Sequence, residues 1–121
     1  MILDDHERLI EALLPAVLAA GRIEMHHFAA GVAVDTKADA TPVTVADHEA
    51  EEVLLEGLMG VAPDVPVIAE EAVAAGRIPT TGDTFFLVDP LDGTRAFIAS
   101  KPEFTINIGL VKDRRPVFGI I

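Results

Sequence analysis

The sequence contains no cysteine, which excludes disulfide bonds, thiolate metal sites and a cysteine nucleophile. It is also poor in positive charge: 9 lysine and arginine residues stand against 20 aspartate and glutamate residues, and the formal net charge is −11. A chain this acidic repels a DNA or RNA backbone, so we expect no nucleic acid polymer as a partner. A phosphate substrate would need positive charge from elsewhere, and bound Mg²⁺ is the simplest source.

Long apolar runs and export signals are absent as well. No stretch reaches the roughly 20 apolar residues that span a bilayer, and the N-terminal residues 1–7 lack the basic charge of a signal peptide. We therefore expect a cytoplasmic protein without a membrane span. The length of 121 residues and the 50% hydrophobic composition suit one domain with a packed core.

Two helices are expected in the first half of the chain. Apolar residues recur with the helical period over residues 9–28, and Pro15 should kink or restart this helix because it lacks an N–H group. Residues 35–42 have turn composition and predict a loop. Thr44 followed three residues later by Asp47 is the pattern of a helix N-cap, so we expect the second helix to begin there.

The second half of the chain predicts four strands, over residues 65–69, 84–88, 104–110 and 117–121. Helices followed by strands that pair in hairpin fashion indicate an α+β fold, a layered α/β sandwich with N-terminal helices packed on a largely antiparallel sheet. The last strand would leave an exposed sheet edge. We therefore expect the chain to be part of a longer protein, and we leave open a homo-oligomer or pairing with another chain through that edge.

The segment Asp-Pro-Leu-Asp-Gly-Thr at residues 89–94 carries the strongest chemical signal. It follows the apolar run 85–88, so Asp89 should lie at the end of a buried strand. Pro90 should end the ladder because it has no donor, and Asp92 should turn back toward Asp89.

This arrangement suits a cation and a phosphate together. Asp89 would bridge two cations, with the carbonyl oxygen of Leu91 as a further ligand. Gly93 and Thr94 would offer backbone N–H groups to a phosphate at the start of a short helix. The alternative is an ordinary solvated Asp-Gly turn.

Three further residues have both a functional and a structural interpretation. Glu70 ends the first predicted strand, so it meets Asp89 if the two strands are neighbours, and otherwise starts a surface loop. Asp47 either offsets the helix dipole or holds the Thr94 hydroxyl, which would then orient or deprotonate a metal-bound water. Lys37 either shields a phosphate or is an ordinary loop lysine.

Other catalytic patterns are missing. The four histidines show no metal-ligand spacing and favour helix-surface roles. There is no glycine-rich phosphate loop of the G-x-x-x-x-G-K type and no serine nucleophile elbow. Haloacid-dehalogenase-type phosphatases place their two aspartates at i and i+2, whereas here they stand at i and i+3 with proline between, which favours metal ligation over a covalent aspartyl phosphate.

Three segments, residues 42–47, 67–71 and 89–94, resemble the successive N-terminal motifs of the inositol monophosphatase-like, lithium-sensitive, Mg²⁺-dependent phosphatases. Within that superfamily, residues 37–44 and 95–108 are most similar to the bacterial 3'(2'),5'-bisphosphate nucleotidases. The resemblance implies hydrolysis of a phosphomonoester by metal-activated water, without a phosphoenzyme. It also implies 3'-phosphoadenosine 5'-phosphate, a by-product of sulfate assimilation, as the substrate, with AMP and phosphate as products.

The resemblance further implies roles for particular residues. Mg²⁺ would be bound by Glu70, Asp89, the Leu91 carbonyl and Asp92; Asp47, Thr94 and Glu70 would be catalytic; and Gly93, Thr94 and Lys37 would bind the phosphate of the substrate.

The same resemblance implies a second, C-terminal α/β domain whose Trp-Asp motif completes the second metal site. Residues 1–121 would then be the N-terminal metal- and phosphate-binding domain, with little or no turnover alone. Within the enzyme class, inositol monophosphatase is the main rival activity, followed by fructose bisphosphatase. Outside it, the rival is a non-catalytic interaction module that binds a metal or phosphate.

Overall fold

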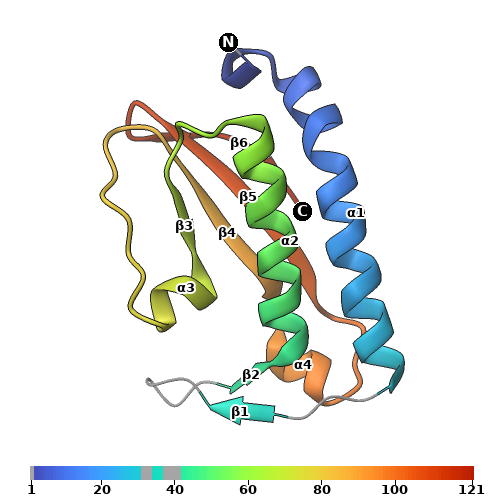
Figure 1. Cartoon of the computed structure of the whole chain (residues 1–121). Coiled ribbons are helices and arrows are strands. Elements are labelled where there is room, and N and C mark those ends of the chain that lie inside the picture. Colours follow the sequence, from blue (N-terminus) through green and yellow to red (C-terminus); the bar gives the residue numbers. More distant parts are fainter. Residues whose placement is uncertain (1, 31–33, 37–41) are drawn as a thin grey trace.

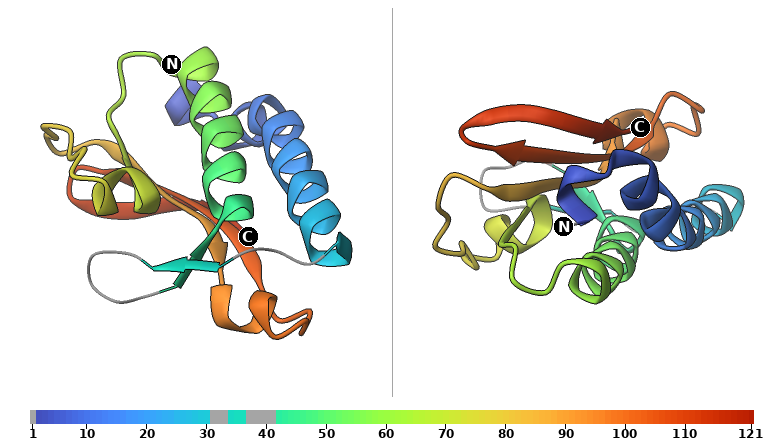
Figure 2. Two further views of the ribbon diagram at one scale, coloured as in Figure 1. Left: turned by 60° about the horizontal axis from the view of Figure 1, so that its bottom comes forward. Right: turned by 90° about the horizontal axis from the view of Figure 1, so that it is seen from above.

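The computed structural model describes residues 2–30, 34–36 and 42–121. Two long helices lie side by side against one face of a four-stranded sheet (Figures 1 and 2). The elements in chain order are η1 (Ile2–Asp4), α1 (His6–Ala30), β1 (Val34–Thr36), β2 (Pro42–Thr44), α2 (Val45–Val61), β3 (Val67–Ala69), α3 (Glu70–Ala74), β4 (Phe85–Asp92), α4 (Thr94–Ile98), β5 (Thr105–Lys112) and β6 (Arg115–Ile120).

Helix α1 runs without a break through Pro15, so the predicted restart of the helix at this residue is wrong. Pro15 is exposed, so the carbonyl group left without an N–H partner is on the solvent side, where water can solvate it. Gly57 of α2 meets Ala16 of α1 so closely that an added Cβ would be 2.4 Å from the alanine Cβ. The two helices therefore pack at short range because both residues are small.

The predicted loop over residues 35–42 is only partly correct. Val34–Thr36 and Pro42–Thr44 form a short antiparallel ribbon in which Val34 faces Thr44. A strand of three residues is too short to show an alternating pattern, so its pairing partner rather than its own sequence defines it. Lys37, which was assigned to phosphate binding, lies outside the described residues.

The sheet has the order β3-β4-β5-β6, with β3 parallel to β4 and both other pairs antiparallel. Its helix-facing side and the helices share one core of apolar residues, which includes Leu9, Leu13, Leu54, Leu58, Phe86, Ile108 and Leu110. The predicted α+β class, with N-terminal helices on a largely antiparallel sheet, is confirmed. Among the described helices, none combines the length and hydrophobicity needed to cross a bilayer.

Strand β4 extends beyond the predicted end of its ladder. Its pairing with β3 stops at Val88, but its pairing with β5 continues from Asp89 opposite Asn107 to Asp92 opposite Thr105. Because β4 uses one more residue than β5 between these two pairs, it contains a bulge there. The prediction that proline ends the ladder is correct toward β3 and wrong toward β5, since the bulge accommodates the residue that lacks a donor.

Candidate active site

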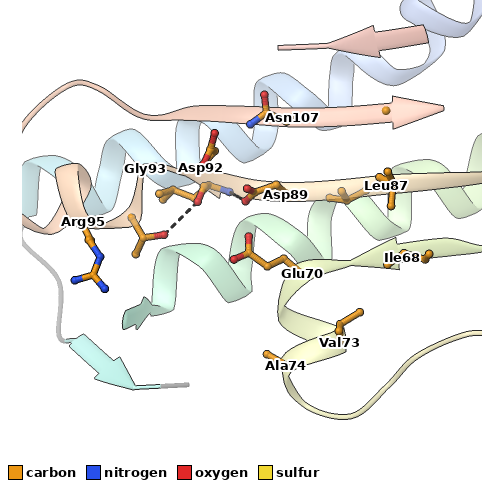
Figure 3. A pocket seen from close by; sticks show the side chains of 14 residues that line it. Ile68, Glu70, Val73, Ala74, Leu87, Asp89, Asp92, Gly93, Arg95 and Asn107 are labelled. Atoms are coloured by element: carbon orange, nitrogen blue, oxygen red, sulfur yellow. Dashed lines mark hydrogen bonds between the residues drawn. The ribbon is translucent and has the colours of Figure 1, made fainter. Parts of the chain in front are cut away.

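A pocket of about 770 Å³ opens where the parallel pair β3 and β4 ends (Figure 3). Side chains from β3, α3, β4, α4 and β5 line it, so residues far apart in the sequence meet around one space. Its apolar wall includes Ile68 and Leu87 on the sheet. Its polar and charged lining residues are Glu70, Asp89, Asp92, Thr94, Arg95 and Asn107.

Glu70 and Asp89 come together as the strand argument predicts. Ala69 pairs with Val88, so Glu70, which begins α3 directly after β3, and Asp89 of β4 lie at the same edge of the sheet. The pKa of Asp89 is raised to about 7, chiefly by burial and then by the hydrogen bond and negative charge of Glu70 and the charge of Asp92. The Leu91 N–H group, which donates to Asp89 Oδ1 at 3.3 Å, acts in the opposite direction.

The Thr94 hydroxyl connects β4, α4 and α2. It lies 3.1 Å from Asp47 Oδ1 and 3.2 Å from the carbonyl oxygen of Leu91, and it can donate its one proton to either. The predicted contact between Asp47 and Thr94, across 47 positions of sequence, is therefore present. When the proton points to Asp47, the hydroxyl oxygen keeps its lone pairs available to a hydrogen-bond donor in the pocket.

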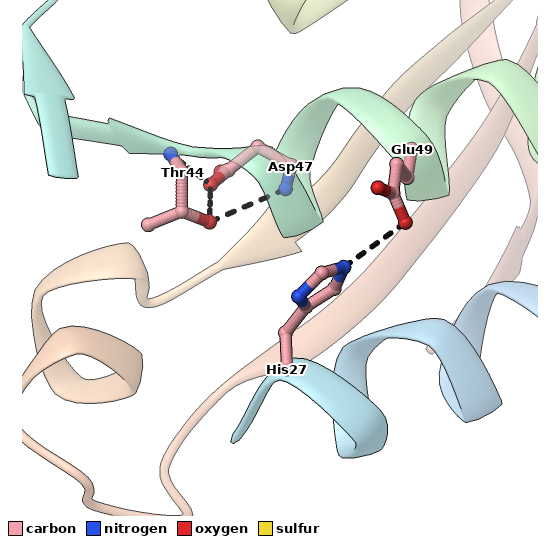
Figure 4. Close-up of polar contacts among 4 residues, drawn as sticks. All are labelled: His27, Thr44, Asp47 and Glu49. Carbon is pink, nitrogen blue, oxygen red and sulfur yellow. Dashed lines mark hydrogen bonds and ion pairs between the residues drawn. The ribbon is translucent and has the colours of Figure 1, made fainter. Parts of the chain in front are cut away.

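Asp47 is also part of the cap of α2: Thr44 is the N-cap residue, and Asp47, three residues on, completes the capping box (Figure 4). The Thr44 N–H group and the Thr44 hydroxyl donate to Asp47 Oδ2 at 2.8 and 2.6 Å, and the Asp47 N–H group donates to Thr44 Oγ1 at 3.4 Å. Asp47 is fully buried. The reciprocal cap thus fixes one carboxylate oxygen and leaves the other for Thr94.

Gly93 connects the end of β4 to α4 with a backbone that other residues rarely adopt. Its φ is +94°, and a Cβ added here would lie 2.5 Å from the carbonyl oxygen of Glu103. Phe97 of α4 packs against Phe104 with ring centroids 4.9 Å apart, and Phe104 packs against Phe28 of α1 at 5.2 Å. This aromatic cluster holds α4, whose first residues Thr94 and Arg95 line the pocket.

Two of the polar and charged pocket residues were not assigned by the sequence argument. Asn107 faces Asp89 across the sheet and donates to the Thr105 hydroxyl at 3.0 Å. Arg95 lines the pocket from the first turn of α4. Asn107 was detectable as a polar residue in an otherwise apolar alternating strand, and Arg95 as a basic residue directly after the acidic motif.

The histidine prediction agrees with the described structure in one informative case. His27 of α1 lies 2.9 Å from Glu49 of α2 and bridges the two helices near the cap of α2 (Figure 4). This is a helix-surface role, as expected.

Buried acidic residues are the main feature that sequence reasoning missed. Glu71 is only 2% exposed, and its N–H group donates to Glu51 Oε1 at 2.7 Å. Glu24 of α1 is also 2% exposed. Burial, together with the negative charges of Asp47 and Asp89, raises the pKa of Glu24 to about 8. Its place on the apolar stripe of α1, four residues after buried Ala20, was the signal.

The donor set suits a hard divalent cation. Carboxylate and carbonyl oxygens are the ligands that Mg²⁺ and Ca²⁺ prefer. The carboxylates of Glu70 and Asp92 act on Asp89 as like charges, and a cation would relieve this repulsion. Within residues 2–30, 34–36 and 42–121, no three His, Asp or Glu side chains converge into a complete cage. A cation here would therefore also need backbone, water or substrate oxygens.

Comparison with curated proteins gives relatives that are longer than this chain. The chain is 46% identical over 85 residues to the 3'(2'),5'-bisphosphate nucleotidase CysQ of Salmonella typhimurium, an alignment that covers 70% of this chain and 35% of that protein. It is 36% identical over 117 residues to the CysQ of Aggregatibacter actinomycetemcomitans, covering 93% and 42%. The chain thus spans about two fifths or less of these relatives.

Solved structures agree with this relationship. An IMPase of Thermotoga maritima superposes with a TM-score of 0.79 at 27% identity, over 93% of this chain and 42% of that one. CysQ of Bacteroides thetaiotaomicron superposes with a TM-score of 0.64 at 37% identity, over 90% and 40%. The family model described as "Inositol monophosphatase family" matches residues 5–121. The sequence resemblance is confirmed, and the chain belongs to the inositol monophosphatase family.

Proposed function

We propose that residues 1–121 form the N-terminal metal- and phosphate-binding part of an Mg²⁺-dependent phosphomonoester hydrolase. The observation that carries this proposal is that Glu70, Asp89 and Asp92 line one pocket. Thr94 lines the same pocket, and its hydroxyl lies 3.1 Å from Asp47 Oδ1. Acidic oxygen ligands next to a buried acceptor for a hydroxyl proton are what metal-assisted hydrolysis requires.

In this proposal the cation is held by Glu70, Asp89, the Leu91 carbonyl and Asp92. Bound Mg²⁺ supplies Lewis-acid stabilisation of phosphoryl oxygens and lowers the pKa of a coordinated water.

The remaining residues orient the reactants. The Thr94 hydroxyl donates a hydrogen bond to Asp47. The Thr94 oxygen can then accept a hydrogen bond from the attacking water and orient that water toward phosphorus. Glu70, at the mouth of the site, completes the catalytic group, and the N–H groups of Gly93 and Thr94, together with Lys37, bind the phosphate.

For the substrate we propose 3'-phosphoadenosine 5'-phosphate, because two of the relatives reported above are named bisphosphate nucleotidases. The water oxygen forms a bond to the 3'-phosphorus, the bond from phosphorus to the 3'-oxygen breaks, and that oxygen takes up a proton, giving AMP and phosphate. Since the chain spans 35% and 42% of these relatives, we expect full turnover only in a longer polypeptide. Inhibition by Li⁺ and a place in sulfate assimilation belong to the same proposal.

A second candidate is hydrolysis of an inositol monophosphate. The observation in its favour is structural: the Thermotoga IMPase superposes with a higher TM-score, 0.79, than the Bacteroides CysQ, 0.64. The sequence identities, 27% and 37%, point the other way.

The test is phosphate release from 3'-phosphoadenosine 5'-phosphate and from inositol 1-phosphate, with Mg²⁺ and with added Li⁺. It is measured on the 121-residue chain and on a version extended through its reading frame. We expect the extended protein to prefer the nucleotide and Asp89→Asn to abolish turnover. Asp83→Asn is the matched control, because Asp83 pairs with Arg114 away from the pocket. If neither form of the protein releases phosphate from either of the two substrates, the proposal is contradicted.

A further inference from the structure

Glu24 is a buried carboxyl group for which the proposed reaction has no use. It is 2% exposed on α1, and its Oε2 atom has no hydrogen-bond partner among the residues that the structure describes. The same stripe of α1 is otherwise apolar at Leu9, Leu13 and Ala20. Burial of a carboxyl group without a partner is costly, and an apolar side chain would pack there without this cost.

The surroundings of Glu24 are acidic. Its two electrostatic neighbours are Asp47, at the start of α2, and Asp89, at the end of the parallel pair, and both raise its pKa. No basic group contributes to that shift. Glu24 is not among the residues that line the pocket. It belongs to α1, the helix that runs beside α2 in both views of Figure 2.

Contacts close to Glu24 in the sequence fix the position of α1 relative to α2. Three residues further along α1, the bond between His27 and Glu49 joins the helix to α2 (Figure 4). Phe28 on the next position packs against the rings of Phe97 and Phe104. Helix α1 is thus fixed against α2 and against the aromatic cluster within four residues of Glu24.

We propose that Glu24 is a positioning residue of the cation site, whose carboxylate strengthens divalent cation binding from behind Asp47 and Asp89 without contacting the cation. This inference rests on the proposed function, because it assumes a cation in the pocket. A third acidic group beside two others destabilises the empty site and stabilises the occupied one. Glu24 would therefore lower the stability of the cation-free protein and raise its affinity for the cation.

The test is the affinity for Mn²⁺, measured by titration calorimetry at about pH 9, above the pKa of about 8 to which Glu24 is raised. We expect Glu24→Gln and Glu24→Leu to weaken Mn²⁺ binding on the order of tenfold, the effect of one nearby charge. We also expect both variants to melt at a higher temperature than the unsubstituted protein when no divalent cation is present. Glu11→Gln, the same change at an exposed position of α1, should leave affinity within about twofold.

The outcomes separate this inference from the proposed function. If the unsubstituted protein binds no Mn²⁺, both fail. If it binds Mn²⁺ and the Glu24 variants bind as tightly as the Glu11 control, only the role of Glu24 fails. Weaker binding together with a lower melting temperature in the cation-free protein would also overturn the inference, since Glu24 would then support the fold rather than the site.

Discussion

Replacing Gly93 with alanine should destabilise the protein by about 2–5 kcal/mol, a large effect for the addition of one methyl group. Gly93 has a φ of +94°, which costs an L-residue roughly 1–2 kcal/mol. The new Cβ would also lie 2.5 Å from the Glu103 carbonyl oxygen and 3.2 Å from the Phe104 Cα. Because both atoms belong to the backbone, either the segment of Glu103 and Phe104 or helix α4 must move, which costs about 1–3 kcal/mol more.

Gly76 provides the matched control that separates these two contributions. Its φ is +85°, but an added Cβ would meet nothing within 4 Å. Gly76→Ala should therefore carry only the conformational cost of about 1–2 kcal/mol.

The assay is urea unfolding of both variants, monitored by circular dichroism. The free energies of unfolding are compared with the same dependence on urea concentration for both variants. Gly93→Ala should also weaken the binding of inorganic phosphate with Mg²⁺, because α4 carries the N–H groups proposed to bind it, and Gly76→Ala should not. Equal destabilisation by the two variants would refute the reasoning, since it would show that the close contact with Glu103 has no energetic weight.

Three other changes test the fold and its pH dependence. Gly57→Ala places a Cβ 2.4 Å from the Cβ of Ala16 on α1, and it should lower the free energy of unfolding in urea by about 1–3 kcal/mol. Gly60→Ala has open space around it and should raise that free energy by about 0.5–1 kcal/mol. Similar values for both variants would contradict the close helix contact. Pro15→Ala should stabilise α1 by about 1–3 kcal/mol, read from the same curves, because it restores an N–H donor at an exposed position; a loss of stability would count against an unbroken helix. Without divalent cations, the free energy of unfolding should fall as pH rises toward 8. The folded state keeps the proton of Glu24 to about pH 8 and that of Asp89 to about pH 7, whereas the unfolded chain loses them near pH 4.5 and 3.8. Glu24→Gln should flatten that slope in unfolding curves collected across the pH range, and an unchanged slope would refute the assignment.

Local patterns were enough to predict the class of the fold and most of its elements. The cap of α2 follows from Thr44 and Asp47, which are neighbours in the chain and need no distant partner. The strands follow from alternating or apolar runs, and the acidic motif at residues 89–94 follows from the residue types alone. The errors at Pro15 and Pro90 have one physical reason: a missing donor is tolerated where solvent or a bulge accommodates it, and this depends on surroundings that the local sequence does not encode.

The amino-acid sequence by itself therefore determined which residues have chemistry to offer and the family to which they belong. Only the tertiary structure decided which of them meet. The parallel pairing of β3 with β4 brings Glu70 to Asp89, and the packing of α2 on the sheet brings Asp47 to Thr94 across 47 positions. The same packing buries Glu24, whose surroundings come from two other elements and give no signal in the neighbouring sequence beyond its place on an apolar stripe.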